Sequence, residues 1–576
     1  MEPIILNLPQ LAADLILIHP PAFYDFRNRD DIYFPFLGTS GDVPITPLYD
    51  YFPIGFKSIQ QILQENNYEV KIINLVTLLL KYPFIDLKYV FQKISAKIFG
   101  IDLHWMVHVQ GSLAIAQILK NVHPEIPIIF GGISSTYFAK ELINYPFIDM
   151  VMRGHATELP LLELLKNIDK NTLEVVPKLV WKTEQGNIRF NKLNYTPDYL
   201  DTKIKWTNIS RMAKNHTLPI SEIITTQIAG CNYNCGWCGG SHYAYSNLLN
   251  KKNIMMKKKQ NIQYEIDSLK KIPSIEKYHL YTVGSYNEKP DDFDFFLDLL
   301  SELPVKSVSY EQFFLTPSDL LKKMVRVNRR TIITLSPESH DQKISKLAGR
   351  GVYSNEELEN WIDNAMSIGI YQIDIWYFIG MPEQDKYSIE KNIEYCNHLL
   401  EKFRGLRVNP MICPMIPFLD PGSKFFNNPS QYGYKVFYRT VEQHRRGMEN
   451  ASIINRLNYE TKWLSRREIV LEGLRAIREL MQIKGKLKIF PEKVIENYVK
   501  LADDAINFIK VVDSVDNIKD KTQRRIELGY LADEIKRRND VIFYSGVTNQ
   551  AFPIKREIGG RWFDEIGWDL NNFESA

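Results

Sequence analysis

Three of the five cysteines in this 576-residue chain lie on one short stretch, AGCNYNCGWCGG, as Cys231, Cys235 and Cys238. A zinc site normally offers four ligands, often as two separated pairs, but Cys396 and Cys413 stand far away and apart from each other. Three thiolates spaced C-x3-C-x2-C can hold three irons of a [4Fe–4S] cluster and leave the fourth iron open. The incomplete ligand set therefore predicts a cluster that binds another molecule rather than one that only transfers electrons.

Six strand–helix repeats in residues 219–429 must position this loop. Their number predicts a partial (β/α)6 barrel, whose active site lies at the carboxyl ends of the strands. The cysteine loop, SPES and GMPEQ all fall at such ends. The expected strands are SEIITTQIAG (221–230), YHLYTVGS (278–285), VKSVSYEQFF (305–314), RTIITLSPES (330–339), YQIDIWYFIGMPEQ (371–384) and LRVNPMICPM (406–415).

Residues 1–185 show the same alternation and predict a separate α/β domain with a doubly wound, Rossmann-like parallel sheet, which binds ligands at the carboxyl ends of its strands. Gly131 and Gly132, followed by Ser134 and Ser135, allow close backbone approach and supply hydroxyl donors. The expected strands are DLILIHPP (14–21), VKIINL (70–75), AKIFGIDL (96–103), IPIIFGG (126–132) and IDMVMRG (148–154).

The sequence also predicts the structure of the segments between and after these two units. A hairpin is expected at KLVWKTEQGNIRFN (178–191), and residues 186–218 are expected to form a linker. Residues 430–576 carry long amphipathic patterns and predict a mainly α domain. Cys396 and Cys413 are expected to be packed thiols.

Composition limits the function classes. A net charge of +3 gives no sign of a general nucleic-acid binder. No apolar run reaches the roughly 20 residues of a membrane span, and MEPIILNLPQ lacks the features of a secretory signal. Few cysteines in such a chain favour a reducing cytoplasm, so we expect a cytoplasmic protein, with peripheral membrane contact as a further expectation.

The cysteine spacing, with an aromatic residue before the third cysteine, resembles the radical S-adenosylmethionine (radical SAM) superfamily. That resemblance implies that the open iron chelates SAM and that Trp237 helps to hold the adenine. It also implies SAM contacts at Ser336 and Glu338 after the fourth strand and at Gly380 and Met381 after the fifth. After the second strand the family has an acidic motif, whereas this chain has Gly284 and Ser285, which implies contacts through backbone carbonyls.

A doubly wound sheet ahead of such a barrel resembles the cobalamin (B12)-binding radical SAM enzymes. The Asp-x-His-x-x-Gly motif that supplies an axial histidine elsewhere is absent after the first strand, so we expect cobalt without a protein nitrogen ligand. His104, in an Asp102-x-His104 pair on a later strand, is the alternative axial ligand. The resemblance implies cobalamin contacts at His19, Pro20, Asp102, His104, Trp105, Gly111, Ser112, Gly131, Gly132, Ser134, Ser135, Arg153 and Gly154.

The resemblance, closest to an archaeal-type group that includes B12-dependent methyltransferases and tetraether-lipid ring synthases, implies carbon–carbon bond formation on an isoprenoid membrane lipid. Methylation of an unactivated carbon in a lipid, small molecule or peptide is the alternative. A ferredoxin or flavodoxin-like electron donor is implied, and no nucleic-acid partner. Apolar loops at 23–38 and 410–426 would suit a lipid chain or pack the domains together, and Lys251 to Lys259 would form a solvated helix start or meet an anionic head group.

Two other classes of protein stay open at this stage. A cobalamin-binding sensor would need no open iron, and an iron–sulfur structural or nucleic-acid-associated protein would prefer four ligands and a basic stripe.

Overall fold

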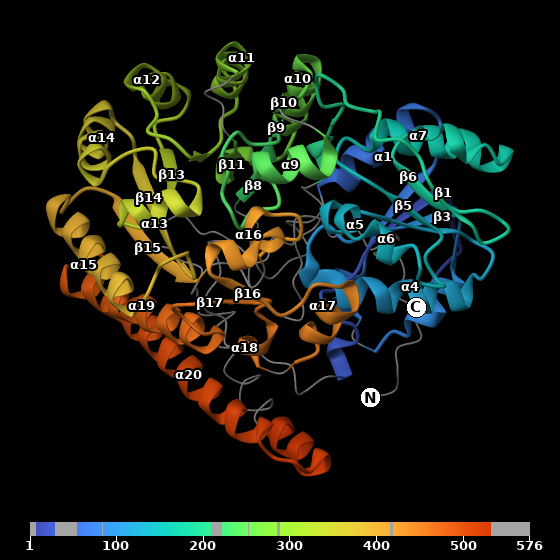
Figure 1. Cartoon of the computed structure of the whole chain (residues 1–576). Coiled ribbons are helices and arrows are strands. Elements are labelled where there is room, and N and C mark those ends of the chain that lie inside the picture. Colours follow the sequence, from blue (N-terminus) through green and yellow to red (C-terminus); the bar gives the residue numbers. More distant parts are fainter. Residues whose placement is uncertain are drawn as a thin grey trace.

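The computed structural model describes residues 7–28, 54–82, 84–208, 222–250, 253–284, 289–414, 419–450 and 452–530. Two parallel sheets dominate it, one in each of the two predicted α/β units, and they lie side by side (Figure 1). The predicted fold class is confirmed.

The first sheet has seven strands in the order β2-β1-β3-β4-β5-β6-β7. The five strands β1 to β5 pair in parallel and have the flavodoxin-like doubly wound order. The hairpin β6–β7 adds to β5 in antiparallel fashion, so the sheet reaches into the segment expected as a linker. The strands are β1 (Leu11–His19), β2 (Val70–Asn74), β3 (Ile94–Asp102), β4 (Ile128–Gly131), β5 (Met150–Met152), β6 (Leu179–Lys182) and β7 (Ile188–Phe190).

Helices cover this sheet, and the longer ones bury an apolar face. In α1, for example, Phe56, Ile59 and Leu63 are buried and recur at helical spacing. The helices are α1 (Gly55–Glu65), α2 (Leu75–Lys81), α3 (Leu87–Gln92), α4 (Val109–Val122), α5 (Ile133–Tyr137), α6 (Ala139–Leu142) and α7 (Glu158–Asn167).

The second sheet consists of the six strands that the sequence predicted, in the order β15-β14-β13-β12-β11-β8 and all parallel. Because β8 and β15 each pair with only one strand in the described part of this sheet, the barrel is open. The strands are β8 (Glu222–Thr226), β11 (His279–Val283), β12 (Ser307–Gln312), β13 (Thr331–Glu338), β14 (Gln372–Ile379) and β15 (Val408–Pro414).

Helices form the outer layer of this open barrel (Figure 1). The layer consists of α10 (Lys259–Leu269), α11 (Pro290–Ser301), α12 (Ser318–Val327), α14 (Asn355–Ile368) and α15 (Lys386–Lys402). Two shorter helices, α9 (His242–Leu249) and α13 (Gln342–Ala348), follow β9 and β13 along the chain. A short antiparallel pair, β9 (Ile228–Ala229) and β10 (Met255–Met256), lies between β8 and α10.

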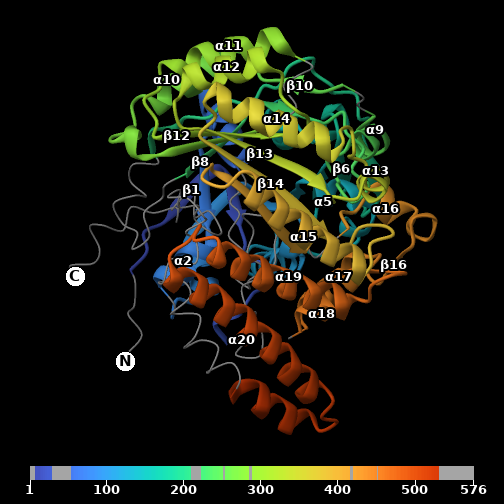
Figure 2. The same ribbon diagram turned by 90° about the vertical axis from the view of Figure 1, so that its left-hand side faces the viewer.

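The C-terminal part is mainly helical as far as residue 530, and it contacts both α/β units. Helix α17 packs against α4 of the first unit, whereas α19 packs along β15 and α15 of the second. Figure 2 shows α20 lying beside α19. Its elements are α16 (Lys424–Asn427), β16 (Tyr434–Val436), α17 (Val441–Met448), α18 (Ile453–Arg456), β17 (Tyr459–Thr461), α19 (Arg466–Lys486) and α20 (Glu492–Asp516).

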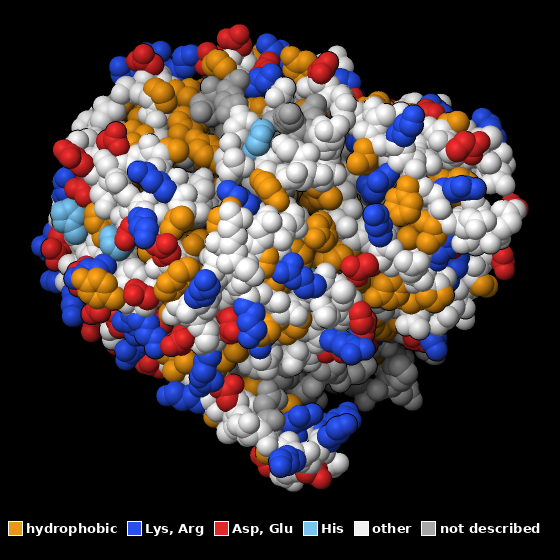
Figure 3. All heavy atoms as spheres, in the orientation of Figure 1, with side chains coloured by type: hydrophobic (Ala, Val, Ile, Leu, Met, Phe, Trp, Pro, Cys, Tyr) orange, Lys and Arg blue, Asp and Glu red, His pale blue; other side chains and the backbone are white. Residues whose placement is uncertain are grey.

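On the face drawn in Figure 3, basic and acidic side chains are interspersed. Within the described part of the chain, no helix combines the length and apolar composition needed to cross a bilayer.

Candidate cluster and cofactor site

The cysteine loop follows β8 and β9 at the carboxyl end of the open barrel. Cys235 is buried and 4% exposed, whereas Cys231 and Cys238 are partly exposed. The backbone N–H of Tyr233 donates to Cys231 Sγ (3.4 Å) and that of Gly240 donates to Cys238 Sγ (3.3 Å). Donors of this kind stabilise thiolate ligands. The loop therefore fits an iron–sulfur cluster held by three thiolates.

Burial raises the pKa of the Cys235 thiol to about 11, although Arg350 opposes the rise. Burial also raises the pKa of Cys238 well above its ordinary value, and the charges of Asp420 and the neighbouring cysteines add to that effect. Without metal these thiols keep their protons, and metal binding must release them.

The C-terminal part holds the loop in place through backbone hydrogen bonds. Phe425 N–H donates to Gly236 O (2.7 Å), and Asp420 N–H donates to Trp237 O (3.1 Å). The Asp420 carboxylate in turn accepts from Gly239 N–H (2.8 Å). Burial raises the pKa of Asp420 to about 6, and the Gly239 amide opposes that rise.

Two glycines let neighbouring segments approach the loop closely. Gly349, just after α13, has a φ of +99°, and a Cβ there would lie 2.0 Å from Asn234 O. A Cβ on Gly236 would lie 2.2 Å from the Phe425 ring. Any larger residue at either position would push the cysteine loop away from its supports.

Ser336 and Glu338 lie beside this loop, at the end of β13, and Arg350 connects them to it. Arg350 Nε donates to Cys235 Sγ (2.8 Å), and its NH1 donates to Ser336 O (3.3 Å). The same Nε lies 3.3 Å from Glu338 Oε1. Glu338 is fully buried, with a φ of +71° that is uncommon for a residue other than glycine. Burial raises its pKa to about 7, against the opposing charge of Arg350.

Gly380 and Met381 follow β14 at the same end of the barrel. The N–H of Gly380 donates to Gln384 Oε1 (2.8 Å), and its carbonyl accepts from the Tyr434 hydroxyl (2.8 Å). Its φ is +105°, and a Cβ would lie 2.9 Å from the Tyr459 hydroxyl. Trp237 lies 6.2 Å from Phe378, between ring centroids. Gly284 directly follows β11, and Ser285 lies outside the described residues.

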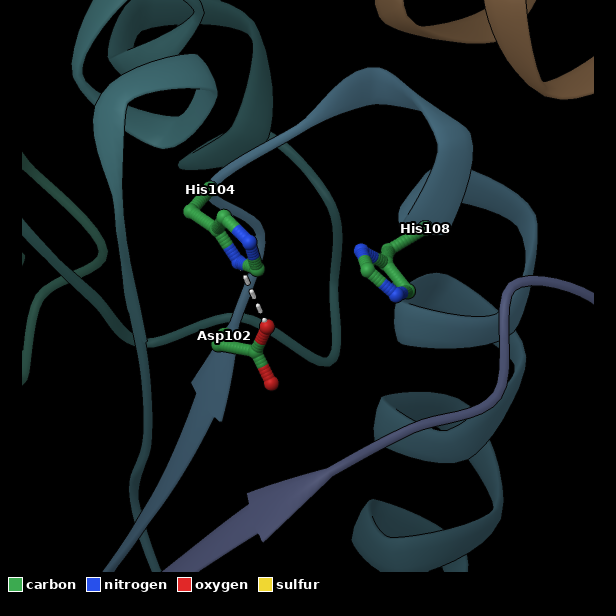
Figure 4. Close-up of side chains that lie close together, drawn as sticks. All are labelled: Asp102, His104 and His108. Atoms are coloured by element: carbon green, nitrogen blue, oxygen red, sulfur yellow. Dashed lines mark hydrogen bonds and ion pairs between the residues drawn. The ribbon is translucent and has the colours of Figure 1, made fainter. Parts of the chain in front are cut away.

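In the first unit, Asp102 lies near His104 and His108 (Figure 4) and also contacts His19, at the carboxyl ends of β1 and β3. Asp102 Oδ1 is 3.0 Å from His19 Nδ1, and Oδ2 is 3.0 Å from His104 Nδ1. The ring of His108 is 5.4 Å from that of His104. Burial alone would raise the pKa of Asp102, but His19 and His104 hold it well below its usual range. The carboxylate is therefore ionised and accepts both Nδ1–H bonds.

Asp102, His104 and His108 also offer ligand atoms within 4.8 Å of one another. Because Asp102 fixes the Nδ1–H tautomer of His104, the Nε2 of His104 is the nitrogen with a lone pair for a metal. Both cobalt and a divalent ion are compatible with this donor set. The prediction that cobalt has no protein nitrogen ligand stays a prediction.

Several residues predicted to contact cobalamin hold the surrounding loops together. Ser112 Oγ donates to Asp102 O (2.8 Å), Ser134 Oγ donates to His104 O (3.0 Å) and Ser135 Oγ donates to Gly131 O (3.0 Å). The Ser134 bond joins the loop after β4 to the loop after β3, next to Asp102, whereas the Ser112 and Ser135 bonds each hold one of these loops to its own strand.

Glycines bring the same loops into close contact. A Cβ on Gly111 would lie 1.8 Å from Pro21 O, in the loop that begins with Pro20. Gly132 has a φ of +111°, and a Cβ there would lie 2.5 Å from His104 Cα.

The remaining predicted cobalamin residues surround this region. Trp105 lies 5.2 Å from His104 between ring centroids. Arg153 Nε donates to Lys178 O (3.1 Å), and Gly154 N–H donates to Thr136 Oγ1 (2.7 Å). The roles of all these residues toward cobalamin stay predictions.

Sequence reasoning missed Arg350, Asp420, Phe425 and Tyr434 as parts of the site. Only Arg350 had a usable signal, because it stands between two glycines in the segment after SPES. The other three lie on the C-terminal part or on the loop before it, so no local pattern connects them to the cysteines.

In the lysine-rich segment 251–259, one residue fits neither the predicted solvated helix start nor the predicted contact with an anionic head group. Lys257 is 1% exposed, and its Nζ donates to Glu265 Oε1 (2.7 Å). This lysine is therefore a buried ion-pair partner, neither solvated nor placed to meet a head group. Lys251 and Lys252 lie outside the described residues, as does most of the apolar loop at 23–38. Cys396 is fully buried in α15, as expected, and the Cys413 side chain lies outside the described residues.

Comparison with known proteins identifies the first unit. Residues 42–162 match the family model of the B12 binding domain. An uncharacterized protein from Methanocaldococcus jannaschii, MJ0966, is 20% identical over 126 residues, which are 22% of this chain and 28% of that protein. The alignment thus spans under a third of the length of that relative.

Solved structures share the overall fold. TsrM from Kitasatospora setae, a radical S-adenosylmethionine methyltransferase with cobalamin and a [4Fe-4S] cluster bound, is 13% identical, with a TM-score of 0.53 over 92% of this chain and 100% of that one. OxsB, a cobalamin-dependent S-adenosylmethionine radical enzyme, is 12% identical, with a TM-score of 0.55 over 95% of this chain and 74% of that one. The predicted arrangement of a B12 binding domain ahead of a radical SAM-type barrel is therefore confirmed as a fold.

Proposed function

We propose that this chain is a cobalamin-dependent radical SAM enzyme that binds a [4Fe–4S] cluster, SAM and cobalamin. The observation that carries the proposal is the three-thiol loop at the carboxyl end of an open parallel barrel, next to a matched B12 binding domain. TsrM, which shares this fold, is a radical S-adenosylmethionine methyltransferase with cobalamin and a [4Fe-4S] cluster bound, and OxsB, which also shares it, is a cobalamin-dependent S-adenosylmethionine radical enzyme. A sensor or a structural iron–sulfur protein would have no use for an open iron beside a second cofactor domain.

In this function Cys231, Cys235 and Cys238 would hold the cluster, while Glu338 and Gly380 would bind SAM beside it. The loops around Asp102 and Gly132 would hold cobalamin. When bound, these groups supply a 5′-deoxyadenosyl radical and a cobalt centre that carries methyl or accepts carbon radicals. The protein contributes binding, orientation and exclusion of water, for which the buried positions of Cys235 and Glu338 are suited.

Anaerobic reconstitution tests this proposal. We expect four irons per chain, stoichiometric cobalamin and SAM-dependent release of 5′-deoxyadenosine with a low-potential electron donor. A ferredoxin or flavodoxin-like protein is the donor that we propose in the cell. A chain that takes up cobalamin but neither binds four irons nor cleaves SAM would instead be a cobalamin-binding sensor.

For the reaction, we propose carbon–carbon bond formation at an unactivated carbon of an isoprenoid membrane lipid, as in tetraether ring formation. The support is the sequence resemblance to archaeal-type ring synthases, and peripheral contact with a membrane would follow from such a substrate. The close alternative is methylation of an unactivated carbon, which the likeness to TsrM favours.

Lipid extracts from a deletion strain and from the same strain after complementation distinguish these reactions. Loss of rings in the deletion supports ring formation, and loss of a methyl branch supports methylation. If both ring number and methylation stay unchanged, the lipid substrate is wrong and a small molecule or peptide is the substrate class to test next.

A further inference from the structure

The guanidinium group of Arg350 lies between a predicted cluster ligand and a predicted SAM-binding carboxylate. Its Nε donates to Cys235 Sγ over 2.8 Å and lies 3.3 Å from Glu338 Oε1. The Arg350 side chain is 8% exposed and that of Glu338 is fully buried. Water therefore screens both charges weakly, and each acts strongly on its neighbours.

The fold fixes this guanidinium in place. Its NH1 donates to Ser336 O (3.3 Å), and its centre lies 4.2 Å from the centroid of the Phe313 ring. The residues before and after it, Gly349 and Gly351, have positive φ values of +99° and +73°, so the backbone turns sharply around Arg350. A planar donor held this firmly keeps its direction toward Cys235.

Reduction makes an iron–sulfur cluster one charge more negative, so a nearby cation and an N–H···S bond both favour the reduced state. A nearby carboxylate has the opposite effect. Resting on the proposed function, we propose that Arg350 is a positioning residue that raises the reduction potential of the cluster through its bond to Cys235, and that Glu338 opposes it.

The expected size follows from the hydrogen bond. A bond to a charged group contributes about 1.5–3 kcal/mol net. If the lower end of this range distinguishes the two redox states, loss of the bond changes the ratio of reduced to oxidised cluster about tenfold. For a one-electron couple that corresponds to about 59 mV.

An EPR-monitored redox titration of the reconstituted full chain at pH 8, without SAM and with dithionite as reductant, measures this ratio. In R350Q we expect the ratio of reduced to oxidised cluster to be about tenfold lower at a fixed potential. In R350K, which keeps the charge but loses the planar donor, this ratio should fall less. E338Q should shift in the opposite direction, toward more reduced cluster.

Arg330→Gln is the matched control. Arg330 is exposed and stands just before β13, whose other end carries Glu338, roughly 26 Å away at 3.3 Å per residue. The reduction potential of the cluster in R330Q should equal that in the unchanged chain, because solvent and salt screen so distant a surface charge.

If R350Q and E338Q both titrate like R330Q, the inference is wrong. If R350Q holds no cluster because Glu338 is left buried without its partner, R350K and E338Q carry the test and must shift in opposite directions. An unchanged chain that binds no four-iron cluster contradicts the proposed function instead, so the two failures are distinguishable.

Discussion

Acid should loosen the contact between the cobalamin-binding unit and the C-terminal part, because His444 is buried there without a charge. His444 is fully buried in α17, and its Nδ1 lies 2.9 Å from Thr440 O. Its ring lies 5.7 Å from Phe138 of the first unit and 6.2 Å from Phe426, between centroids. A proton on the second ring nitrogen would place a charge among these aromatic rings.

The size of the effect follows from linkage between protonation and folding. Burial lowers the pKa of His444 from 6.5 to about 4, although the bond to Thr440 opposes that shift. Above pH 6.5 neither the folded nor the unfolded chain binds this proton, so the contribution to stability is fully present. As the pH falls from 6.5 toward 4, only the unfolded chain binds it. At pH 5 the loss is about 2 kcal/mol, at 1.36 kcal/mol per pKa unit.

Urea unfolding at pH 7.5 and pH 5.0 checks this prediction by comparing the unchanged chain with His444→Gln. The free energy of unfolding of the unchanged chain should fall by about 2 kcal/mol more than that of the variant. His398→Gln is the control: its ring is exposed and pairs with Glu359 at 3.2 Å, and surface pairs of this kind contribute under about 1 kcal/mol. Equal losses in the unchanged chain and in His444→Gln would refute the reasoning.

Three further predictions concern the cofactors. Cys235→Ala should abolish both cluster binding and SAM cleavage while the circular dichroism spectrum is retained. Cys396→Ala, the control, should keep the cluster. A Cys235→Ala protein that still cleaves SAM at the normal rate contradicts the cluster assignment. Gly349→Ala should sharply lower iron uptake, because its Cβ would lie 2.0 Å from a loop carbonyl, and Gly405→Ala, also at positive φ but with open space around it, should not. Hydroxocobalamin bound to the full chain should give a spectrum without a nitrogen lower ligand, and a nitrogen-ligated spectrum that disappears in His104→Ala would show that this prediction is wrong.

The sequence predicted the elements that repeat and missed the contacts that only folding creates. The six barrel strands carry β-branched, aromatic or other apolar residues and alternate with helical patterns, so their places and their carboxyl ends could be recognised. Three cysteines close in sequence have to be close in space. Asp420 is 181 residues from Gly239, to which it bonds, and no local pattern encodes such a pair.

Other features depend on the three-dimensional environment. The three-residue strands β16 and β17 are too short to give a periodic signal, yet β16 brings Tyr434 to Gly380. The positive φ of Glu338 lies at an irregularity in the register between β13 and β14, which arises from pairing rather than from residue type. Likewise, the Asp102–His104 pair is visible in the sequence, but the approach of His19 and His108 is not.

The packing of α19 along β15 has a consequence for shortened forms of this protein. Among the described residues of its sheet β15 pairs with β14 alone, and edge strands that lose their cover recruit strands from other molecules. Helix α19 lies against β15, and its Lys484 donates from Nζ to Asn409 Oδ1 (2.7 Å). A chain that ends before α19 keeps every residue predicted to bind a cofactor, but it uncovers the apolar side of an edge strand and leaves Asn409 without this donor. Such a chain is prone to self-association, so the cofactor-binding units need the C-terminal helices if they are to be purified without aggregating.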